Sequence, residues 1–185
     1  MAKKGYIVSD QKVKIEKLVP GGQGICTTID GKKGFFWGVL PGETVVEYKV
    51  TKDKSKYFEA VALKVEDESA ERIEPQDPCY LSTSPWQIMT YDYELKQKAE
   101  ILVEIFRQEG IEISEVEVAT DGNDFQYRNK MEYALYWDNE TGFISPAMHE
   151  RGSHRKVPIA KSSIERPEIF AKAVEIINDL NARHE

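Results

Sequence analysis

The stretch from residue 11 to residue 65 constrains the fold most strongly, because short β-type runs alternate there with tight-turn signals. The pair Asp30-Gly31 is typical of a two-residue hairpin turn. The pair Pro41-Gly42 fits a type II turn, in which proline fixes φ first and glycine takes the positive φ second. Five strands are predicted, at residues 11–18, 23–29, 33–40, 44–51 and 57–65. So many strands in so short a stretch favour an OB-like closed β-barrel.

Alternation along these runs predicts which side chains point inward, because successive side chains of a strand face opposite sides of a sheet. In the fourth run, Val46, Tyr48 and Val50 alternate with charged residues. The three consecutive aromatic residues at 35–37 cannot all face one way, so at least one of them is expected in the core. The other inward candidates are Val13, Ile15, Leu18, Phe58, Ala60, Ala62 and Val65.

The rest of the chain mixes helical and strand signals. Residues 66–90 are rich in acidic residues and prolines, which favours a linker or an extended surface segment. Helical periodicity predicts a helix over 92–108, and Gly110 is a suitable C-terminal stop. Further strands are predicted at 112–119, 130–137 and 154–159, with a less regular one at 141–145, before a last helix that begins near Pro167.

Charge divides the chain at a similar place. Residues 1–64 carry 12 lysines and 7 acidic residues, a net charge of +5, whereas residues 65–185 carry 13 basic and 25 acidic residues, a net charge of −12. A basic first third favours binding to a polyanion. The positive charge is explained equally well if the lysines only keep a small barrel solvated. We therefore expect a mixed α+β chain in three parts: a five-stranded OB-like barrel over 1–68, a linker over 69–90, and an α+β domain over 91–185 with an antiparallel sheet and two helices.

Several classes of protein do not fit the sequence. No apolar run approaches the ~18 residues that a membrane span needs, and no apolar signal region follows the N-terminal lysines. Cys26 and Cys79 are too few for a disulfide framework, so a cytoplasmic protein without a membrane partner is expected. His149 and His154 lack partners at metal-ligand spacing, and no metal site is expected.

Two runs in the predicted barrel resemble a TRAM domain, the small OB-like RNA-binding barrel of several RNA-modifying enzymes. They are VKIEKLVPGGQG at residues 13–24 and GVLPGETV at residues 38–45. A TRAM domain also occurs in methylthiotransferases, whose radical chemistry needs a three-cysteine cluster motif. The chain holds only Cys26 and Cys79, so it does not fit that class.

Later motifs resemble RNA (uracil-5-)-methyltransferases and follow one another in that family's order. The run PWQ at 85–87 is similar to the segment after the family's iron–sulfur motif. The runs FQYRNK at 125–130, GF at 142–143 and RGSHRKVPI at 151–159 are similar to its central domain. The resemblance implies the N-terminal, RNA-binding part of an enzyme that methylates uridine in tRNA or rRNA.

The chain also departs from that family. Many members hold a four-iron–four-sulfur cluster between the two domains, but only Cys79 lies there in this chain, and a cluster needs about four thiolates. No cluster is therefore expected, and Cys79 is either a relic of the first ligand or a small buried residue. No Gly-x-Gly-x-x-Gly turn follows a strand, so S-adenosylmethionine is expected only in a catalytic domain outside this chain. Cys26 is interpreted as a core residue, and no residue is assigned to catalysis or to a cofactor.

The candidates for RNA contact are basic and aromatic residues of both regions. Lysine supplies salt-dependent attraction to phosphate, arginine's planar fork suits phosphates and base edges, and aromatic rings on an OB-like face stack bases. The barrel candidates are Lys14, Lys17, Lys32, Lys33, Phe35, Trp37, Lys54, Lys56 and Tyr57, with Lys52 and Phe36 beside them. The later candidates are Arg128, Lys130, Arg151, His154, Arg155 and Lys156, which meet on one edge if strands 130–137 and 154–159 pair. An alternative interpretation fits the later group equally well: these residues are ordinary surface charges that pair with Glu132 and Glu150.

Three functions stay open at this level. The order of the motifs favours an RNA-binding part of a methyltransferase, inactive alone, with a catalytic domain in cis. The alternatives are a free-standing RNA-binding or RNA-chaperone protein and a scaffold whose basic patches contact an acidic protein.

Overall fold

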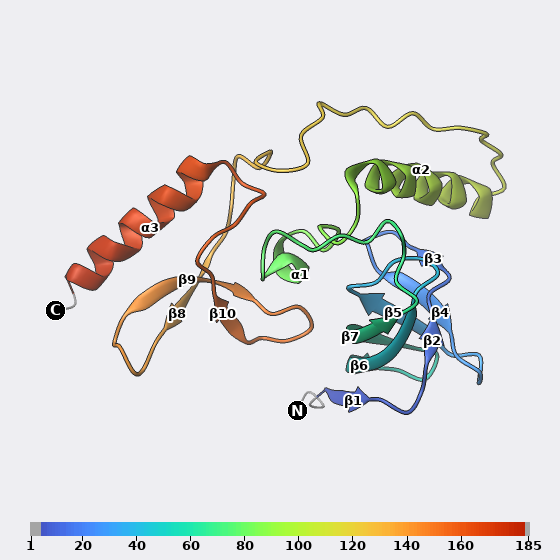
Figure 1. Cartoon of the computed structure of the whole chain (residues 1–185), viewed down its shortest axis with the longest axis horizontal. Coiled ribbons are helices and arrows are strands. Elements are labelled where there is room, and N and C mark those ends of the chain that lie inside the picture. The colour runs from blue at the N-terminus through green and yellow to red at the C-terminus, as the bar shows by residue number, and fades with distance from the viewer. Residues whose placement is uncertain (1–4, 184–185) are drawn as a thin grey trace. The chain divides into compact units, whose positions relative to one another are not determined.

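A computed structural model describes residues 5–183, and this part of the chain forms two β-sheets and three helices (Figure 1). The prediction of a mixed α+β chain is confirmed. The described residues divide into two compact units. One unit holds the residues up to Glu74 together with Pro85–Thr120, and the other holds Pro75–Ser84 together with the residues from Asp121 onward. These limits differ from the predicted boundaries at 68 and 90.

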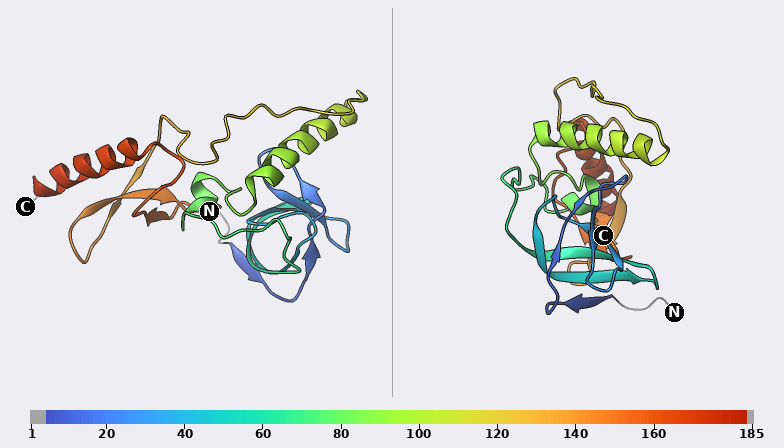
Figure 2. Two further views of the ribbon diagram at one scale, coloured as in Figure 1. Left: turned by 45° about the horizontal axis from the view of Figure 1, so that its top comes forward. Right: turned by 90° about the vertical axis from the view of Figure 1, so that its right-hand side faces the viewer.

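The first unit is built on a seven-stranded sheet. Its strands are β1 (Tyr6–Val8), β2 (Val13–Lys14), β3 (Lys17–Leu18), β4 (Gly24–Thr27), β5 (Lys33–Trp37), β6 (Thr44–Asp53) and β7 (Tyr57–Glu66). The order along the sheet is β1-β6-β7-β5-β4-β3, with β2 also paired to β6. The two long strands β6 and β7, coloured teal, lie side by side (Figure 2). All pairs are antiparallel except β5 and β7, which are parallel.

The run predicted as one strand at 11–18 is two short strands with different neighbours. β2 pairs with β6, and β3 pairs with β4. Between them, the Ile15 amide donates to the Glu43 carbonyl at 2.9 Å and the Glu16 amide donates to the Ile25 carbonyl at 2.8 Å. This one segment therefore hydrogen-bonds to strands that lie far apart in the order of the sheet.

The two predicted turns have different outcomes. Asp30-Gly31 was expected to make a two-residue turn, and this is wrong. The loop has three residues, because the Thr28 amide donates to the Lys32 carbonyl and the Gly31 amide donates to the Thr28 carbonyl, both at 2.9 Å. Of the loop residues only Gly31 has a positive φ, at 82°. Pro41-Gly42 forms the predicted turn, with Gly42 at a φ of 87° and the Glu43 amide donating to the Leu40 carbonyl.

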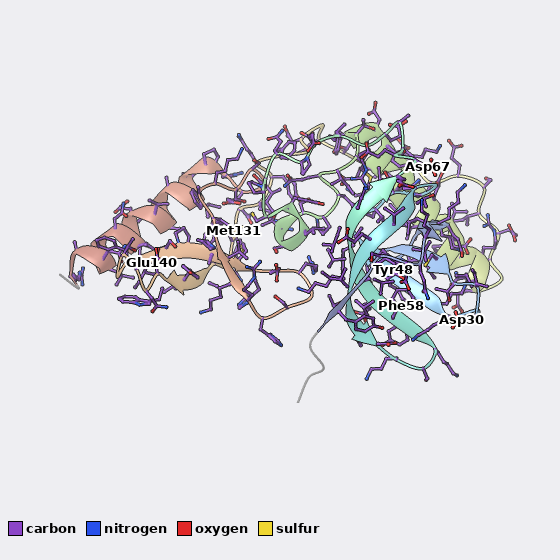
Figure 3. All side chains as sticks on the ribbon, turned by 60° about the horizontal axis from the view of Figure 1, so that its bottom comes forward. Asp30, Tyr48, Phe58, Asp67, Met131 and Glu140 are labelled. Atoms are coloured by element: carbon purple, nitrogen blue, oxygen red, sulfur yellow. The ribbon has the colours of Figure 1, made fainter. Side chains whose placement is uncertain are left out.

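The core of this sheet follows the predicted alternation. Among the three consecutive aromatics, Phe36 is the one that is fully buried, and its ring meets Tyr48 and Phe58 edge-on at 5.0 and 5.5 Å between ring centres. Tyr48 and Phe58, labelled in Figure 3, stack on each other at 6.0 Å. A Cβ at Gly34 would lie 2.5 Å from the Phe58 ring, so glycine there is required by close packing. Cys26 is fully buried in the same cluster, as predicted.

Residues 66–90, expected as a linker or an extended surface segment, are ordered and partly buried. Glu43 is fully buried and accepts from both Nε and Nη2 of Arg72 at 2.6 Å. Glu43 also accepts from the Leu40 and Ser69 amides, at 2.7 and 3.2 Å. The fork geometry satisfies both carboxylate oxygens. This buried ion pair ties the segment after β7 to the turn that precedes β6.

Helix α2 (Tyr91–Gln108) confirms the predicted helix at 92–108. Its C-terminal end is capped around Gly110: the Gly110 amide donates to the Arg107 carbonyl at 3.0 Å and the Ile111 amide donates to the Phe106 carbonyl at 2.9 Å. With a positive φ at Gly110, this is a Schellman motif. The helix belongs to the first unit, whereas the predicted second domain began at its start.

The second unit holds a three-stranded antiparallel sheet and two helices. Its strands are β8 (Ala134–Trp137), β9 (Ile144–His149) and β10 (Lys156–Pro158), and its helices are α1 (Tyr80–Thr83) and α3 (Pro167–Ala182). Strand β9 lies between the other two, so the predicted strands at 130–137 and 154–159 do not pair, which was the condition for their basic residues to meet on one edge. The strand expected at 112–119 is not formed, and most side chains there are exposed with no sheet neighbour. Helix α3 begins at Pro167 as predicted.

Replacing Glu43 with glutamine keeps the size of the side chain but removes the charge that faces Arg72. Breaking one partner of a buried pair leaves the other uncompensated, so the free energy of unfolding of the first unit should fall by about 3 kcal/mol. Urea denaturation followed by tryptophan fluorescence measures this change. The control is Glu47→Gln on the half-exposed side of β6, expected to change stability by less than about 0.5 kcal/mol. Equal stabilities of the two variants would contradict the role given to Glu43.

Candidate nucleic-acid interface

The outward side of strands β5 and β7 carries two aromatic rings among lysines. Because Phe36 and Phe58 point into the core, strand alternation places their neighbours on the opposite side of the sheet. The parallel register sets Lys33 beside Tyr57 and Phe35 beside Glu59. Lys52 joins them from β6, where it is paired with Glu59. We call this surface the outer patch; its members are Lys33, Phe35, Lys52, Tyr57 and Glu59.

Three contacts define the geometry of the outer patch. The rings of Phe35 and Tyr57 meet edge-on, with 5.9 Å between their centres and 86° between their planes. Lys52 Nζ lies 5.2 Å from the centre of the Tyr57 ring and donates to Glu59 Oε1 at 2.7 Å. The hydrogen bond that Lys52 donates to Glu59, followed by its hydrogen bond with Tyr57, raises the pKa of Lys52 above its usual value. A cation over a ring beside a carboxylate is an arrangement that a nucleotide, with its flat base and its phosphate, can replace.

The other predicted lysines of the first unit fall into two groups. Lys54 and Lys56 are exposed in and next to the β6–β7 turn, and Lys14 is exposed on β2; none of the three side chains has a partner among residues 5–183. Three others already have partners: Lys17 pairs with Glu104 at 2.6 Å, Lys32 pairs with Asp53, and Lys33 donates to the Thr27 hydroxyl at 2.6 Å. Trp37 is half-buried at the end of β5.

In the second unit, two predicted RNA ligands bind the backbone of α1. Arg128 Nη2 donates to the Thr83 carbonyl at 3.2 Å, and Arg151 Nε donates to the Leu81 carbonyl at 2.7 Å. The Ser82 hydroxyl donates to the His149 carbonyl at 2.6 Å. Burial lowers the pKa of Arg151. The motifs at 125–130 and 151–159 therefore both contact the short helix α1. Their strands do not pair with each other.

The remaining basic candidates of the second unit lie at the surface. Lys130 pairs with Glu132 at 3.1 Å and Arg155 pairs with Glu150. These are the two ion pairs expected if the basic residues are ordinary surface charges. Lys156 Nζ donates to the Leu135 carbonyl at 3.0 Å, and His154 is exposed. A hollow of about 290 Å³ lies beside α1; its lining includes Thr83, Arg128, Lys130, Met131 and Met148.

Two buried carboxylates that sequence reasoning missed hold this unit together. Asp77 accepts from the Ser163 amide at 2.9 Å and from the Ser163 hydroxyl at 2.6 Å. Glu165 accepts from the Tyr133 hydroxyl at 2.5 Å and from the Ser162 hydroxyl. Burial, followed by the hydrogen bond to Glu165, raises the pKa of Tyr133. No local pattern indicates these bonds, because Asp77 and Ser163 are 86 residues apart.

Neither cysteine lies in an environment that would favour a reactive thiolate. Burial raises the pKa of Cys26 to about 11, and Cys79, half-buried at the start of α1, has its pKa raised for the same reason. Among the described residues, no three histidine, cysteine or acidic side chains gather as a metal site requires. No helix in residues 5–183 is both long enough and apolar enough to cross a lipid bilayer.

Replacing Arg151 with alanine should loosen α1 without unfolding the second unit. A hydrogen bond from a charged group contributes about 1.5–3 kcal/mol, so hydrogen exchange of the amides at 80–84 should accelerate roughly tenfold or more. Arg155→Ala, which removes only an exposed pair with Glu150, is the control and should leave these amides unchanged. Equal exchange in both variants, measured by mass spectrometry, would refute the stabilising role of Arg151.

Comparison with known proteins identifies relatives over most of the chain. No protein-family model matches the chain. The 23S rRNA (uracil(1939)-C(5))-methyltransferase RlmD of Pectobacterium carotovorum is 30% identical over 162 residues, which cover 86% of this chain and 35% of that protein. The protein of the same name from Shewanella sp. (strain ANA-3) is 31% identical over 94% of this chain and 39% of its own length. An uncharacterized RNA methyltransferase of Thermotoga maritima is 30% identical over 66% of this chain and 28% of its own length.

These matches agree with the motifs in the sequence. The chain spans between 28% and 39% of the length of the three relatives. The chain is therefore a relative of the RNA (uracil-5-)-methyltransferases, which confirms the resemblance carried by its own motifs.

Proposed function

We propose that this chain is the RNA-binding part of an rRNA (uracil-5-)-methyltransferase and that structured rRNA is its ligand. The observation that carries the proposal is the outer patch, where the rings of Phe35 and Tyr57 lie next to Lys33 and Lys52. Aromatic rings on a strand surface stack bases, while nearby lysines attract phosphates without regard to sequence. The names of the relatives, which act on 23S rRNA, favour rRNA over tRNA.

The first unit would act as a TRAM-type, OB-like barrel. Support comes from the segment that contains β2 and β3, which bonds to β6 on one side and to β4 on the other. These two pairings would let the sheet curl back on itself, and its outward side would then be available to RNA. The unpartnered Lys54 and Lys56 lie at the end of the long strands β6 and β7, next to the outer patch.

The second unit would add phosphate contacts of its own. Lys130 and Arg155 are exposed and are held only by surface ion pairs. Such pairs contribute about 0–1 kcal/mol, so a phosphate can replace the carboxylate. Arg128 and Arg151 would support this surface by holding α1, and neither is proposed as a direct phosphate ligand.

The methylation itself would be carried out by another part of the enzyme. The two units described here would hold the RNA so that an extruded uridine reaches a catalytic domain with S-adenosylmethionine. Cys26 is buried and protonated at neutral pH, so it does not serve as the nucleophile. The chain alone, mixed with S-adenosylmethionine and rRNA, should transfer no methyl group in a radiolabel assay.

Affinity for RNA should depend on the unpaired lysines at the β6–β7 turn. In a fluorescence-anisotropy titration with an rRNA hairpin, the double variant Lys54→Glu/Lys56→Glu should bind roughly tenfold more weakly. Its log–log salt slope should shrink by about 0.7 for each phosphate that the variant no longer neutralises.

The control reverses the charge of Lys96 and Lys172 instead, which are exposed on α2 and α3. This control changes the net charge by the same amount and should bind almost as tightly as the unaltered chain. Absence of RNA binding at low salt, or an equal drop in affinity in the two double variants, would refute the proposed interface.

A further inference from the structure

One member of the outer patch does not fit a surface that only attracts phosphate. Glu59 lies on β7 next to the two aromatic residues, beside Phe35 in the register and two residues after Tyr57. Its side chain is 31% exposed. A carboxylate within a phosphate-binding surface repels the phosphate, so Glu59 should instead make a contact that suits a carboxylate, such as accepting hydrogen bonds from N–H groups.

Only one oxygen of Glu59 is occupied. Oε1 accepts from Lys52 at 2.7 Å, while Oε2 has no hydrogen bond within residues 5–183. The free oxygen is therefore open to a donor that arrives over the Tyr57 ring.

Lys52 covers the surface that such a donor would use. Its ammonium lies 5.2 Å from the Tyr57 ring centre and is held there by Glu59. The Lys52 side chain is 45% exposed, and an exposed ion pair of this kind is weak. Lys52 can thus turn to a phosphate of the bound RNA, which uncovers the ring and both carboxylate oxygens together.

We propose that the outer patch is a reading site for a single unpaired guanine, in which Tyr57 stacks the base and Glu59 accepts its Watson–Crick N–H groups. Lys52 then pairs with the phosphate of that nucleotide, and Phe35 packs edge-on against the stacked assembly. This inference rests on the proposed RNA-binding function and adds a base preference to it.

The chemistry of the base edges selects guanine. Guanine presents N1–H and N2–H₂ side by side, which matches the two oxygens of a carboxylate in the manner of a bidentate pair. Uracil presents one N–H between two carbonyl oxygens, which the carboxylate repels. Adenine and cytosine each present one amino group next to an acceptor nitrogen, so each satisfies a single oxygen.

The test uses uridine-rich nine-nucleotide RNAs with guanine, inosine, adenine or uracil at the central position. The unaltered chain should bind the guanine RNA about tenfold more tightly than the uracil RNA, the range expected for one bidentate base contact. Inosine lacks the N2 amino group, so the inosine RNA should lose most of that advantage.

The variant Glu59→Gln separates base reading from simple charge. It should abolish the preference for guanine and raise the affinity for the uracil RNA a few-fold, because one negative charge is gone and Lys52 is released. The control Glu66→Gln removes a carboxylate that pairs with Lys12 at 2.7 Å outside the outer patch, and it should keep the preference.

The outcomes distinguish this inference from the function on which it rests. If the chain binds all four RNAs equally, or if Glu59→Gln raises all four affinities by the same factor, guanine reading is overturned while RNA binding stands. If no RNA binds at low salt, the proposed function fails, and the reading site fails with it.

Discussion

The parallel pairing of β5 with β7 is the constraint on which the first unit depends. One register sends Phe36 and Phe58 into the core and leaves Phe35, Tyr57 and Glu59 outside. Gly34 fixes this register, because a side chain there would collide with the Phe58 ring. A slip by one residue would exchange the two faces of each strand. The hydrophobic core and the proposed RNA surface therefore both follow from this one register.

The second unit divides its basic residues between structural support and the exposed surface. Arg128 and Arg151 donate to backbone carbonyls of α1, and the buried Asp77 and Glu165 hold the segment at 162–165 against the rest of the unit. A buried hydrogen-bonding group that is left without its partner costs about 1–3 kcal/mol, so these contacts stabilise the positions of α1 and of the segment at 162–165 within the unit. Arg128 and Arg151, which the motifs indicated as RNA ligands, mainly hold α1 in place.

Local signals in the sequence predicted most of the local structure, although Asp30-Gly31 lies in a three-residue loop and not in the expected two-residue turn. The alternation at 44–51, the stop at Gly110 and the turn at Pro41-Gly42 all depend on neighbouring residues, and the structure confirms them. The strand expected at 112–119 failed because alternation alone does not provide a partner strand. The Glu43–Arg72 and Asp77–Ser163 bonds join distant residues, and nothing in the sequence around either residue indicates its partner. The sequence identifies Lys33, Phe35 and Tyr57 as separate candidates, but it does not show that strand pairing brings them onto one surface. Nor does it indicate that Lys52 pairs with Glu59.

Ultraviolet cross-linking to an rRNA fragment, followed by mass spectrometry of the linked peptides, tests the central claim most directly. Rings that stack on bases form cross-links efficiently, so the adducts are expected at Phe35 and Tyr57. Cross-links confined to the second unit, or to residues on the core side of β5 and β7, would contradict it.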